Sequence, residues 1–343
     1  MPVRTLIVDD SASIRAALAR ILSADPDIEV VGQAPEPHAA RQMIKALEPD
    51  VITLDVEMPG MDGLQFLERI MRLRPMPVVM CSTLTARGAV TTIEALRLGA
   101  VDCIAKPSGN AADLGQSAAL LRKTVKAAAR SSVRASSTPA RPISNGVRLR
   151  TDMVIGIGSS TGGVEALFSL LPALPAECPP ILIVQHMPAA FTGSFADRLD
   201  RECRLKVVEA RDGDPVVPGT VYIAPGGERH MELAGGASGC IRLRAGETYS
   251  GHRPSVDLLF RSIAQRRPSA VGVILTGMGA DGAEGLLEMR QAGARTLGQS
   301  KDSCVVYGMP RAAFENGAVE RELSLVALPE AILAACGQKV GIR

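Results

Sequence analysis

Aromatic residues are scarce in this chain of 343 residues, which has no Trp, three Tyr and six Phe. Proteins that bind single-stranded nucleic acid stack bases on aromatic side chains, and so few aromatics offer little surface for that. An excess of one charge is also missing, because 38 Lys and Arg are balanced by 36 Asp and Glu for a net charge of +2. The chain lacks the basic footprint of a dedicated nucleic-acid binder, so we expect no nucleic-acid partner.

Long apolar runs and paired cysteines are missing too. No stretch approaches the ~20 apolar residues that a membrane span needs. The opening MPVRTLIVDD ends its short apolar run in two aspartates rather than in a cleavage site. The seven cysteines are odd in number, scattered, and form no CxxC pair. These features predict a cytoplasmic protein with reduced thiols, no zinc site and no membrane insertion.

The middle of the chain has no acidic residue between Leu114 and Thr151, although it holds eight Lys and Arg. Its later part, 131–150, is rich in Ser, Pro and Arg and shows neither helical nor strand periodicity. We therefore predict a first domain over 1–125, a basic flexible linker over 126–150 and a second domain over 151–343. The linker is a solvated tether or, alternatively, a docking strip for an acidic partner.

Short apolar segments alternate with helix-like segments in the first domain. The helix-like segments have apolar residues three and four positions apart, whereas the short segments are apolar throughout. Such a unit repeated five times predicts an α/β fold, a doubly wound five-stranded parallel sheet covered on both faces. The expected strands are TLIVDD, VVGQA, VITLDVE, VVMCST and DCIAKP, separated by SASIRAALARILSA, HAARQMIKALE, GLQFLERIMRL and GAVTTIEALRLG.

The same alternation returns in the second domain. MVIGIGSS, ILIVQH and VGVILTG read as strands, and each is followed by a helix-like segment. The stretch 205–250 contains short, turn-rich strands and is predicted to be an antiparallel insert. We expect a second α/β domain with a mostly parallel sheet.

Polar side chains follow the expected strands of the first domain. The carboxyl ends of parallel strands meet at one edge of the sheet, so these side chains should lie close together. Three neighbouring carboxylates repel one another unless a cation lies between them, and oxygen ligands suit Mg²⁺. A lysine and a hydroxyl beside them favour phosphoryl transfer onto a carboxylate. The residues are Asp9, Asp10, Asp55, Ser82, Thr83 and Lys106.

This combination resembles the receiver domain of two-component response regulators, a flavodoxin-like fold, over roughly 1–125. The resemblance implies that a histidine kinase is the phosphodonor and that Asp55 is phosphorylated. It further implies that Asp9 and Asp10 bind Mg²⁺ with Asp55, and that the phosphoryl group is bound by Ser82 or Thr83 together with Lys106. Cys103 stands where many receivers carry an aromatic switch residue, which puts a Tyr/Phe rotamer switch in doubt.

A GxSxG pattern opens the second domain. Gly158 and Gly162 flank Ser160 between an expected strand and an expected helix, and they permit a tight turn that lifts the hydroxyl above the sheet edge. Gly156-x-Gly158 also fits a dinucleotide-binding loop. Thr161 stands where that loop needs its third glycine, and the next strand ends in Gln-His instead of a ribose-binding acid. Dinucleotide binding is thus the weaker interpretation.

His186 ends the next strand, and Asp281 follows the strand VGVILTG, so both should reach the sheet edge of Ser160. Ser160 would be the nucleophile, His186 the general base and Asp281 the residue that orients the imidazole. Backbone N–H groups of Thr161 and Met278 are candidates for an oxyanion site. Other aspartates are worse placed, in helical patterns or in the predicted insert: Asp197, Asp200, Asp257, Asp212 and Asp214.

The motifs GSSTGG, QHMP, IAPGGERHM, RPSVD, LTGMGADGA and SCVVYGMP resemble the catalytic domain of chemotaxis protein-glutamate methylesterases, which join it to a receiver. The resemblance implies hydrolysis of glutamate γ-methyl esters on methyl-accepting chemoreceptors, which resets receptor signalling during adaptation, and deamidation of receptor glutamines. It implies no cofactor for the esterase chemistry. It also implies that the unphosphorylated receiver blocks the triad. It gives no role to His230, His252 or Arg253.

Two other functions compete with a hydrolase. One is a receiver-controlled docking protein with little catalysis, which a degenerate triad would have favoured. The other is a DNA-binding response regulator, but the second domain lacks a helix-turn-helix pattern with a basic recognition helix. We therefore expect an enzyme.

Overall fold

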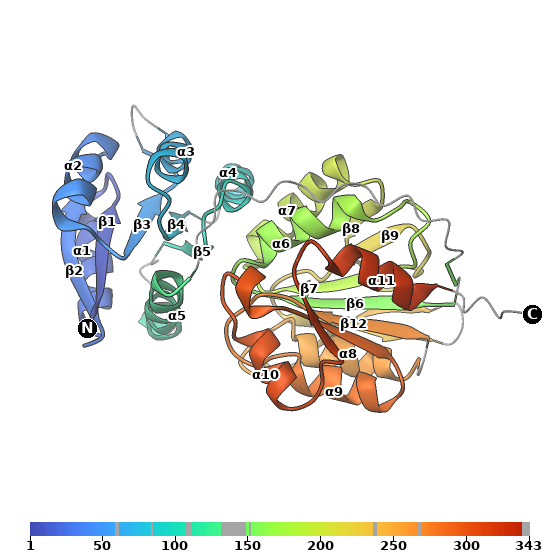
Figure 1. The fold of residues 1–343 in the computed structure, drawn as a ribbon. Coiled ribbons are helices and arrows are strands. Elements are labelled where there is room, and N and C mark those ends of the chain that lie inside the picture. The colour runs from blue at the N-terminus through green and yellow to red at the C-terminus, as the bar shows by residue number, and fades with distance from the viewer. Residues whose placement is uncertain are drawn as a thin grey trace, which may run out of the picture. The chain divides into compact units, whose positions relative to one another are not determined.

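The structure is a computed structural model that describes residues 1–58, 62–83, 85–106, 111–131, 149–150, 152–235, 239–266 and 269–337. The chain divides into two compact units, Met1–Ser137 and Thr138–Arg343 (Figure 1). Most of the predicted linker, 132–148, lies outside the described residues, while its first four residues belong to a helix that ends at Ala129. The domain limits 1–125 and 151–343 stay predictions.

The first unit is a five-stranded parallel sheet in the order β2-β1-β3-β4-β5. This order and the helices on both faces confirm the predicted doubly wound, flavodoxin-like fold. Every residue of β3 and β4 is buried, which explains their continuous apolar sequences. The strands are β1 (Val3–Val8), β2 (Ile28–Ala34), β3 (Val51–Asp55), β4 (Val78–Ser82) and β5 (Asp102–Ala105). The helices are α1 (Ala12–Ser23), α2 (Pro37–Leu47), α3 (Gly63–Leu73), α4 (Ala86–Arg97) and α5 (Ala111–Ala129).

Local signals begin and end these helices. Ser11 accepts a hydrogen bond from the N–H of Ile14 at the start of α1, and Thr85 accepts one from Gly88 at the start of α4. Gly99 follows α4 with φ +103, a left-handed conformation that favours glycine after a helix. The capped starts of α1 and α4 follow the loops after β1 and β4, which lie at the carboxyl edge of the sheet.

The second unit is built on a seven-stranded sheet in the order β14-β13-β12-β6-β7-β9-β8, in which all pairs are parallel. The mostly parallel sheet predicted from the sequence is confirmed. The strands are β6 (Val154–Ser159), β7 (Ile181–Gln185), β8 (Lys206–Glu209), β9 (Thr220–Ile223), β12 (Ala270–Ile274), β13 (Arg295–Gln299) and β14 (Arg321–Leu323). The helices are α6 (Gly163–Leu170), α7 (Ala189–Glu202), α8 (Val256–Ala264), α9 (Ala283–Gln291), α10 (Met309–Glu315) and α11 (Leu328–Cys336), with 3-10 turns η1 (Leu171–Ala173) and η2 (Lys301–Ser303).

The stretch 205–250 differs from the predicted antiparallel insert. Its first half, β8 and β9, extends the parallel sheet next to β7. Its second half forms an antiparallel pair, β10 (Arg229–Ala234) with β11 (Cys240–Ala245). The prediction was wrong for the first half because parallel neighbours usually need a long helical crossover, and the segment 210–219 between β8 and β9 contains no helix.

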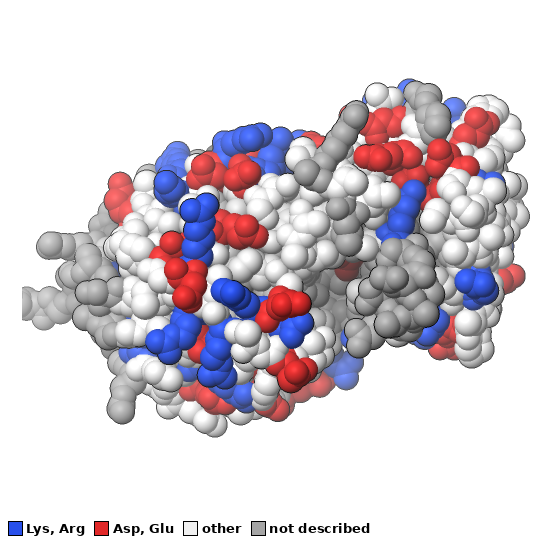
Figure 2. All heavy atoms as spheres, turned by 180° about the vertical axis from the view of Figure 1, so that it is seen from behind, with Lys and Arg blue, Asp and Glu red and all other residues white. Residues whose placement is uncertain are grey.

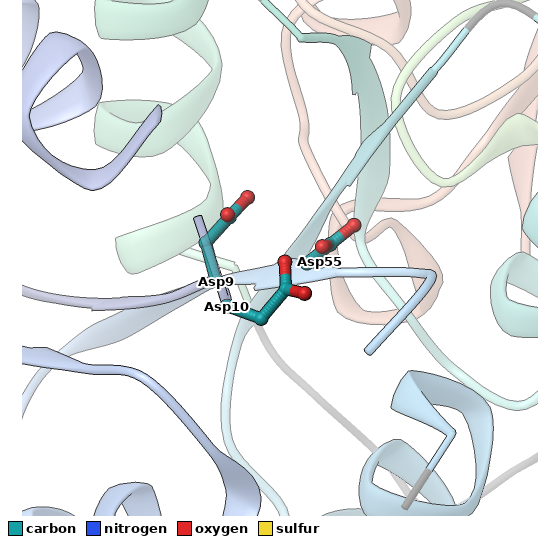
Figure 3. A group of neighbouring side chains, drawn as sticks. All are labelled: Asp9, Asp10 and Asp55. Carbon is teal, nitrogen blue, oxygen red and sulfur yellow. The ribbon is translucent and has the colours of Figure 1, made fainter. Parts of the chain in front are cut away.

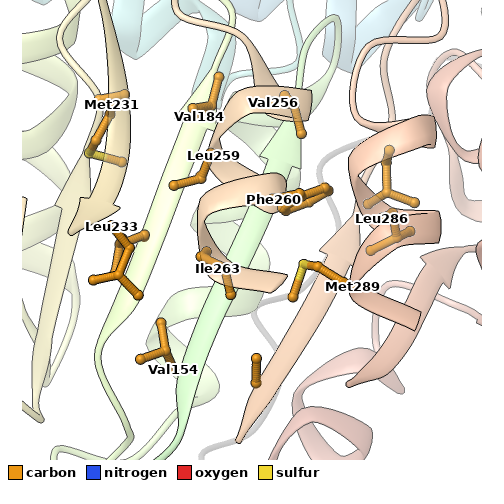
Figure 4. Packing of buried hydrophobic residues seen from close by; sticks show 14 of the residues in the cluster. Val154, Val184, Met231, Leu233, Val256, Leu259, Phe260, Ile263, Leu286 and Met289 are labelled. Carbon is orange, nitrogen blue, oxygen red and sulfur yellow. The ribbon is translucent and has the colours of Figure 1, made fainter. Parts of the chain in front are cut away.

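One hydrophobic cluster of the second unit lies between the sheet and α8, α9 and the β10–β11 pair (Figure 4). Helix α8 lies so close to β6 that side chains on the strand would collide with it. A Cβ on Gly158 would be 2.2 Å from Val256 Cγ1, and one on Gly156 would be 2.7 Å from Ile263 Cδ1. The Gly156-x-Gly158 pair considered for dinucleotide binding therefore serves helix packing, and it brings the start of α8 to the sheet edge.

No helix in the described part of the chain is long and apolar enough to cross a membrane. Acidic and basic side chains are interspersed on the face of the units seen in Figure 2, in line with the balanced composition.

Candidate functional site

Three carboxylates meet at the carboxyl edge of the first sheet (Figure 3). Asp9 and Asp10 follow β1 and Asp55 ends β3, and one oxygen of each lies within 4.8 Å of the others. Asp9 and Asp55 are buried, whereas Asp10 is exposed. Hard oxygen donors, with one carboxylate open to solvent, fit a hydrated Mg²⁺ ion.

Lys106 joins this cluster from the residue after β5. Its Nζ lies 2.9 Å from Asp9 Oδ2 and 2.7 Å from Asp55 Oδ2. Burial raises the pKa of Asp55 above its ordinary value, and the nearby ammonium offsets this only in part. Burial would lower the pKa of Lys106, but its two carboxylate partners outweigh that and raise it. The lysine therefore stays charged between the two acids.

Ser82 and Thr83 lie at the same edge, with different exposure. Cys81 is opposite Asp55 in the strand register, so Ser82 follows directly beyond it. Ser82 is buried and donates its hydroxyl hydrogen to the carbonyl of Thr83 at 3.1 Å, whereas Thr83 is exposed. Cys103 is buried in β5, and burial raises its pKa, so a neutral thiol occupies this position.

Ser160 occupies the turn between β6 and α6. Its N–H donates to Thr276 O at 3.0 Å, and its carbonyl accepts from Gly163 N at 2.8 Å. Gly162 has φ +78, and a Cβ there would be 2.5 Å from Val305, so the turn requires glycine. Within the described residues, the Ser160 hydroxyl makes no hydrogen bond, so it is available to a ligand.

His186 and Asp281 meet beside this turn. The strand register pairs Ser159 with Gln185, so His186 is the neighbour of Ser160. His186 Nε2 lies 2.9 Å from Asp281 Oδ2. His186 Nδ1 is buried and has no hydrogen-bond partner in the described part of the protein. This ring nitrogen is therefore the one left to accept a proton.

Asp281 is buried but well supplied with donors. Besides His186, its carboxylate accepts from Ser255 Oγ at 2.8 Å and from the N–H groups of Val256 and Asp257 at 2.8 and 3.1 Å. These N–H groups form the start of α8, where the helix dipole favours negative charge. Burial would raise the pKa of Asp281, but the bonds from His186 and the helix outweigh it and lower the pKa. Asp281 therefore stays ionised.

Sequence reasoning missed three supporting residues. Gln185 is buried and binds three groups around the turn: it accepts from Ser159 Oγ at 2.7 Å and donates to the carbonyls of Ser160 and His186 at 2.9 and 3.0 Å. Ser255 was signalled by its place just before an expected helix. His252 stacks on His186, and no sequence pattern indicated this contact.

Asp257 was considered worse placed than Asp281 because of its helical pattern, and it lies at the start of α8 beside Asp281. It accepts from Gly285 N at 2.8 Å and from Ser250 Oγ at 3.1 Å. Burial raises the pKa of Asp257 to about 6.

The loop that carries Met278 also lies against Ser160. A Cβ on Gly277 would be 2.7 Å from Ser160 Cβ. The N–H of Met278, which is half-buried, has no acceptor among the residues that the structure describes. The carbonyl of Thr161 accepts from Thr276 Oγ1 at 3.0 Å, which ties this residue to the end of β12. Both predicted oxyanion donors thus flank Ser160.

The fold and the acidic cluster of the first unit define a receiver domain. The second unit brings a serine, a histidine and an aspartate to one edge of its sheet, the residue types that serine-type hydrolases use.

Comparison with known proteins identifies a family for each of the two units. The CheB methylesterase family matches residues 155–332, and the response regulator receiver domain matches residues 5–118. The protein-glutamate methylesterase/protein-glutamine glutaminase 1 of Caulobacter vibrioides is 58% identical over 336 residues, which are 96% of this chain and 97% of that protein. The protein-glutamate methylesterase/protein-glutamine glutaminase of Rhizobium etli is 54% identical over 97% of this chain and 96% of that protein.

Among solved structures, the catalytic domain of the Thermotoga maritima CheB methylesterase has a TM-score of 0.52 and 39% identity, covering 54% of this chain and 99% of that chain. The chain belongs to the CheB methylesterase family.

Proposed function

We propose that this chain is a phosphorylation-activated enzyme that hydrolyses glutamate γ-methyl esters, and deamidates glutamines, on cytoplasmic segments of chemoreceptors. Its high identity to named protein-glutamate methylesterases over nearly the whole chain supports this reaction. The observation that carries the proposal is the His186–Asp281 bond of 2.9 Å beside the turn of Ser160. The seven free cysteines agree with a cytoplasmic location.

In the proposed mechanism, Ser160 Oγ attacks the γ-carbonyl carbon of the ester while its proton passes to His186 Nδ1. Asp281 accepts the Nε2–H bond and stabilises the imidazolium that forms. The N–H groups of Thr161 and Met278 bind the oxyanion. The imidazolium then gives its proton to the departing methoxide, and methanol leaves. Water, deprotonated by the same histidine, hydrolyses the acyl-enzyme to glutamate; a glutamine releases ammonia by the same steps.

The receiver is proposed to control this activity. Asp55 accepts a phosphoryl group from a histidine kinase, and Lys106 with Ser82 or Thr83 binds the phosphoryl oxygens. Asp9, Asp10 and Asp55 would hold Mg²⁺, which neutralises charge on the transferred group when bound. The clustered carboxylate oxygens, within 4.8 Å of one another, support this assignment.

Methanol release from a methylated receptor tests the proposed reaction. We expect the phosphodonor-treated chain to release methanol and Ser160→Ala to lose this activity, because the nucleophile is removed. Ser324→Ala, at an exposed serine of the same unit, is the matched control and should be active. Equal release by wild type and Ser160→Ala would favour the docking protein, or place the nucleophile elsewhere.

A further inference from the structure

A second imidazole lies flat on His186. The ring centroids of His186 and His252 are 3.8 Å apart, and the ring planes differ by 3°. His252 is half-buried and belongs to the loop between β11 and α8. Neither the sequence motifs nor the proposed mechanism gives this residue a role.

The loop presents His252 on a tight hairpin. Tyr249 and His252 exchange two backbone hydrogen bonds of 3.0 and 2.9 Å. Ser250 and Gly251 between them have φ +51 and +78, as a type I′ turn requires. The left-handed conformation is costly for a serine, and residues held in such conformations cluster at functional sites. The hydrogen bond from Ser250 Oγ to Asp257 helps to hold this turn.

Both ends of the hairpin are anchored. On one side, the guanidinium of Arg261 lies 4.9 Å from the centre of the Tyr249 ring and donates to its hydroxyl. On the other side, Arg253 donates to the carbonyls of Gly227 and Gly246 at 2.8 and 2.6 Å. Because the hairpin is tied to the loop between β9 and β10, to the start of its own loop and to α8, the position of His252 is fixed by the fold.

The stacked ring restrains the plane of the His186 ring. The polar anchor of the His186 ring is the bond from Nε2 to Asp281, and a ring held by one such bond can tilt about it. A flat group against its face opposes that tilt, and it touches the face of the ring rather than the edge that carries Nδ1. Displacing a reacting group by about 1 Å can cost about 100-fold in rate.

We propose that His252 is a positioning residue for this reaction, which stacks on His186 and keeps Nδ1 aligned for proton transfer. The proposal rests on the proposed function, in which His186 is the general base. It requires a flat ring at position 252, because the contact with His186 is through the ring face. A planar apolar side chain should therefore replace His252, whereas a non-planar one of similar volume should not.

The test measures kcat and KM for methanol release by the whole phosphodonor-activated chain. We expect His252→Ala and His252→Leu to lower kcat about 10- to 100-fold with KM within about twofold, and His252→Phe to restore most of the rate. His38→Ala, at an exposed histidine of the first unit, is the matched control. Thermal unfolding identifies any variant that fails to fold, and the Leu–Phe pair remains informative if His252→Ala does.

His186→Ala separates the two proposals. If it is as active as wild type, His186 is not the base and the proposed function fails. If it is inactive while His252→Ala and His252→Leu keep full kcat, the positioning role alone is overturned. Equal loss in His252→Phe and His252→Leu would also overturn it, because the imidazole nitrogens would then be needed.

Discussion

A buried aspartate lies at the carboxyl edge of each parallel sheet, and the two carboxylates are held differently. Asp281 accepts four hydrogen bonds, from His186, Ser255 and the first two N–H groups of α8. Among the described residues, Asp55 accepts one backbone N–H, from Glu57, and is paired with the ammonium of Lys106. Burial accordingly raises the pKa of Asp55, whereas the bonds to Asp281 outweigh burial and lower its pKa.

The difference fits the role that we propose for each carboxylate. A carboxylate that attacks phosphorus and binds a metal ion must exchange its partners, so few fixed donors and one long, flexible lysine suit it. A carboxylate that orients an imidazole must keep one position and one charge, so rigid donors from a helix start suit it. Residues of the same type at equivalent sheet edges thus acquire different chemistry from their donors.

Replacing the reacting carboxylate should have the largest effect. Asp55→Asn is expected to abolish incorporation of phosphate from radiolabelled acetyl phosphate with Mg²⁺, because an amide oxygen cannot attack as a carboxylate does. Asp50→Asn, at an exposed aspartate just before β3, should be phosphorylated normally. Full phosphorylation of Asp55→Asn would place the acceptor elsewhere.

Replacing the orienting carboxylate should be severe but incomplete. Asp281→Asn is expected to lower kcat roughly 10³- to 10⁴-fold without unfolding the chain, because an amide can still accept N–H bonds but cannot stabilise the imidazolium. Asp302→Asn, at an exposed aspartate of the same unit, serves as control.

The losses of kcat caused by Ser160→Ala, His186→Ala and Asp281→Asn should not add when the substitutions are combined, because we propose that the three residues act as one unit. Additive losses in the triple variant would contradict the triad.

A smaller effect should follow from a substitution that loosens the turn of Ser160 but leaves every charge of the site in place. Gln185→Leu removes two donors that hold the carbonyls of Ser160 and His186, and it leaves these groups without their buried partner. We expect kcat to fall about 10- to 100-fold and the melting temperature to drop, since each unsatisfied buried group costs about 1–3 kcal/mol. Gln291→Leu, at an exposed glutamine, is the comparison. Unchanged kcat in folded Gln185→Leu would show that the turn holds its shape without this amide.

The sequence predicted the residues at strand ends because parallel sheets bring those ends together. Asp9, Asp55 and Lys106 in one sheet, and His186 with Asp281 in the other, could be placed from periodicity alone. The prediction failed over β8 and β9, where a helix-free connection joins parallel neighbours and removes the usual sign of a crossover.

The supporting contacts could not be predicted because they join distant segments through packing. The bonds from α8 to Asp281 depend on the close approach of α8 to Gly156 and Gly158. The sequence made a dinucleotide-binding loop the weaker interpretation of that glycine pair, but it did not show that the pair makes room for Val256 and Ile263. The stacking of His252 on His186 likewise depends on a hairpin whose anchors, Arg253 and Arg261, contact other loops and helices.

The contrast between the two carboxylates is tested most directly by a pH titration of aspartate carboxyl carbons, followed by ¹³C NMR in the metal-free chain. As the pH falls, the chemical shift of the Asp55 carboxyl carbon should change with a midpoint above pH 3.8, the ordinary pKa of aspartate. The Asp281 carbon should keep its ionised position below that pH, for as long as the second unit stays folded. If Asp281 instead took up a proton before Asp55, the donors around the two carboxylates would not set their charges as described.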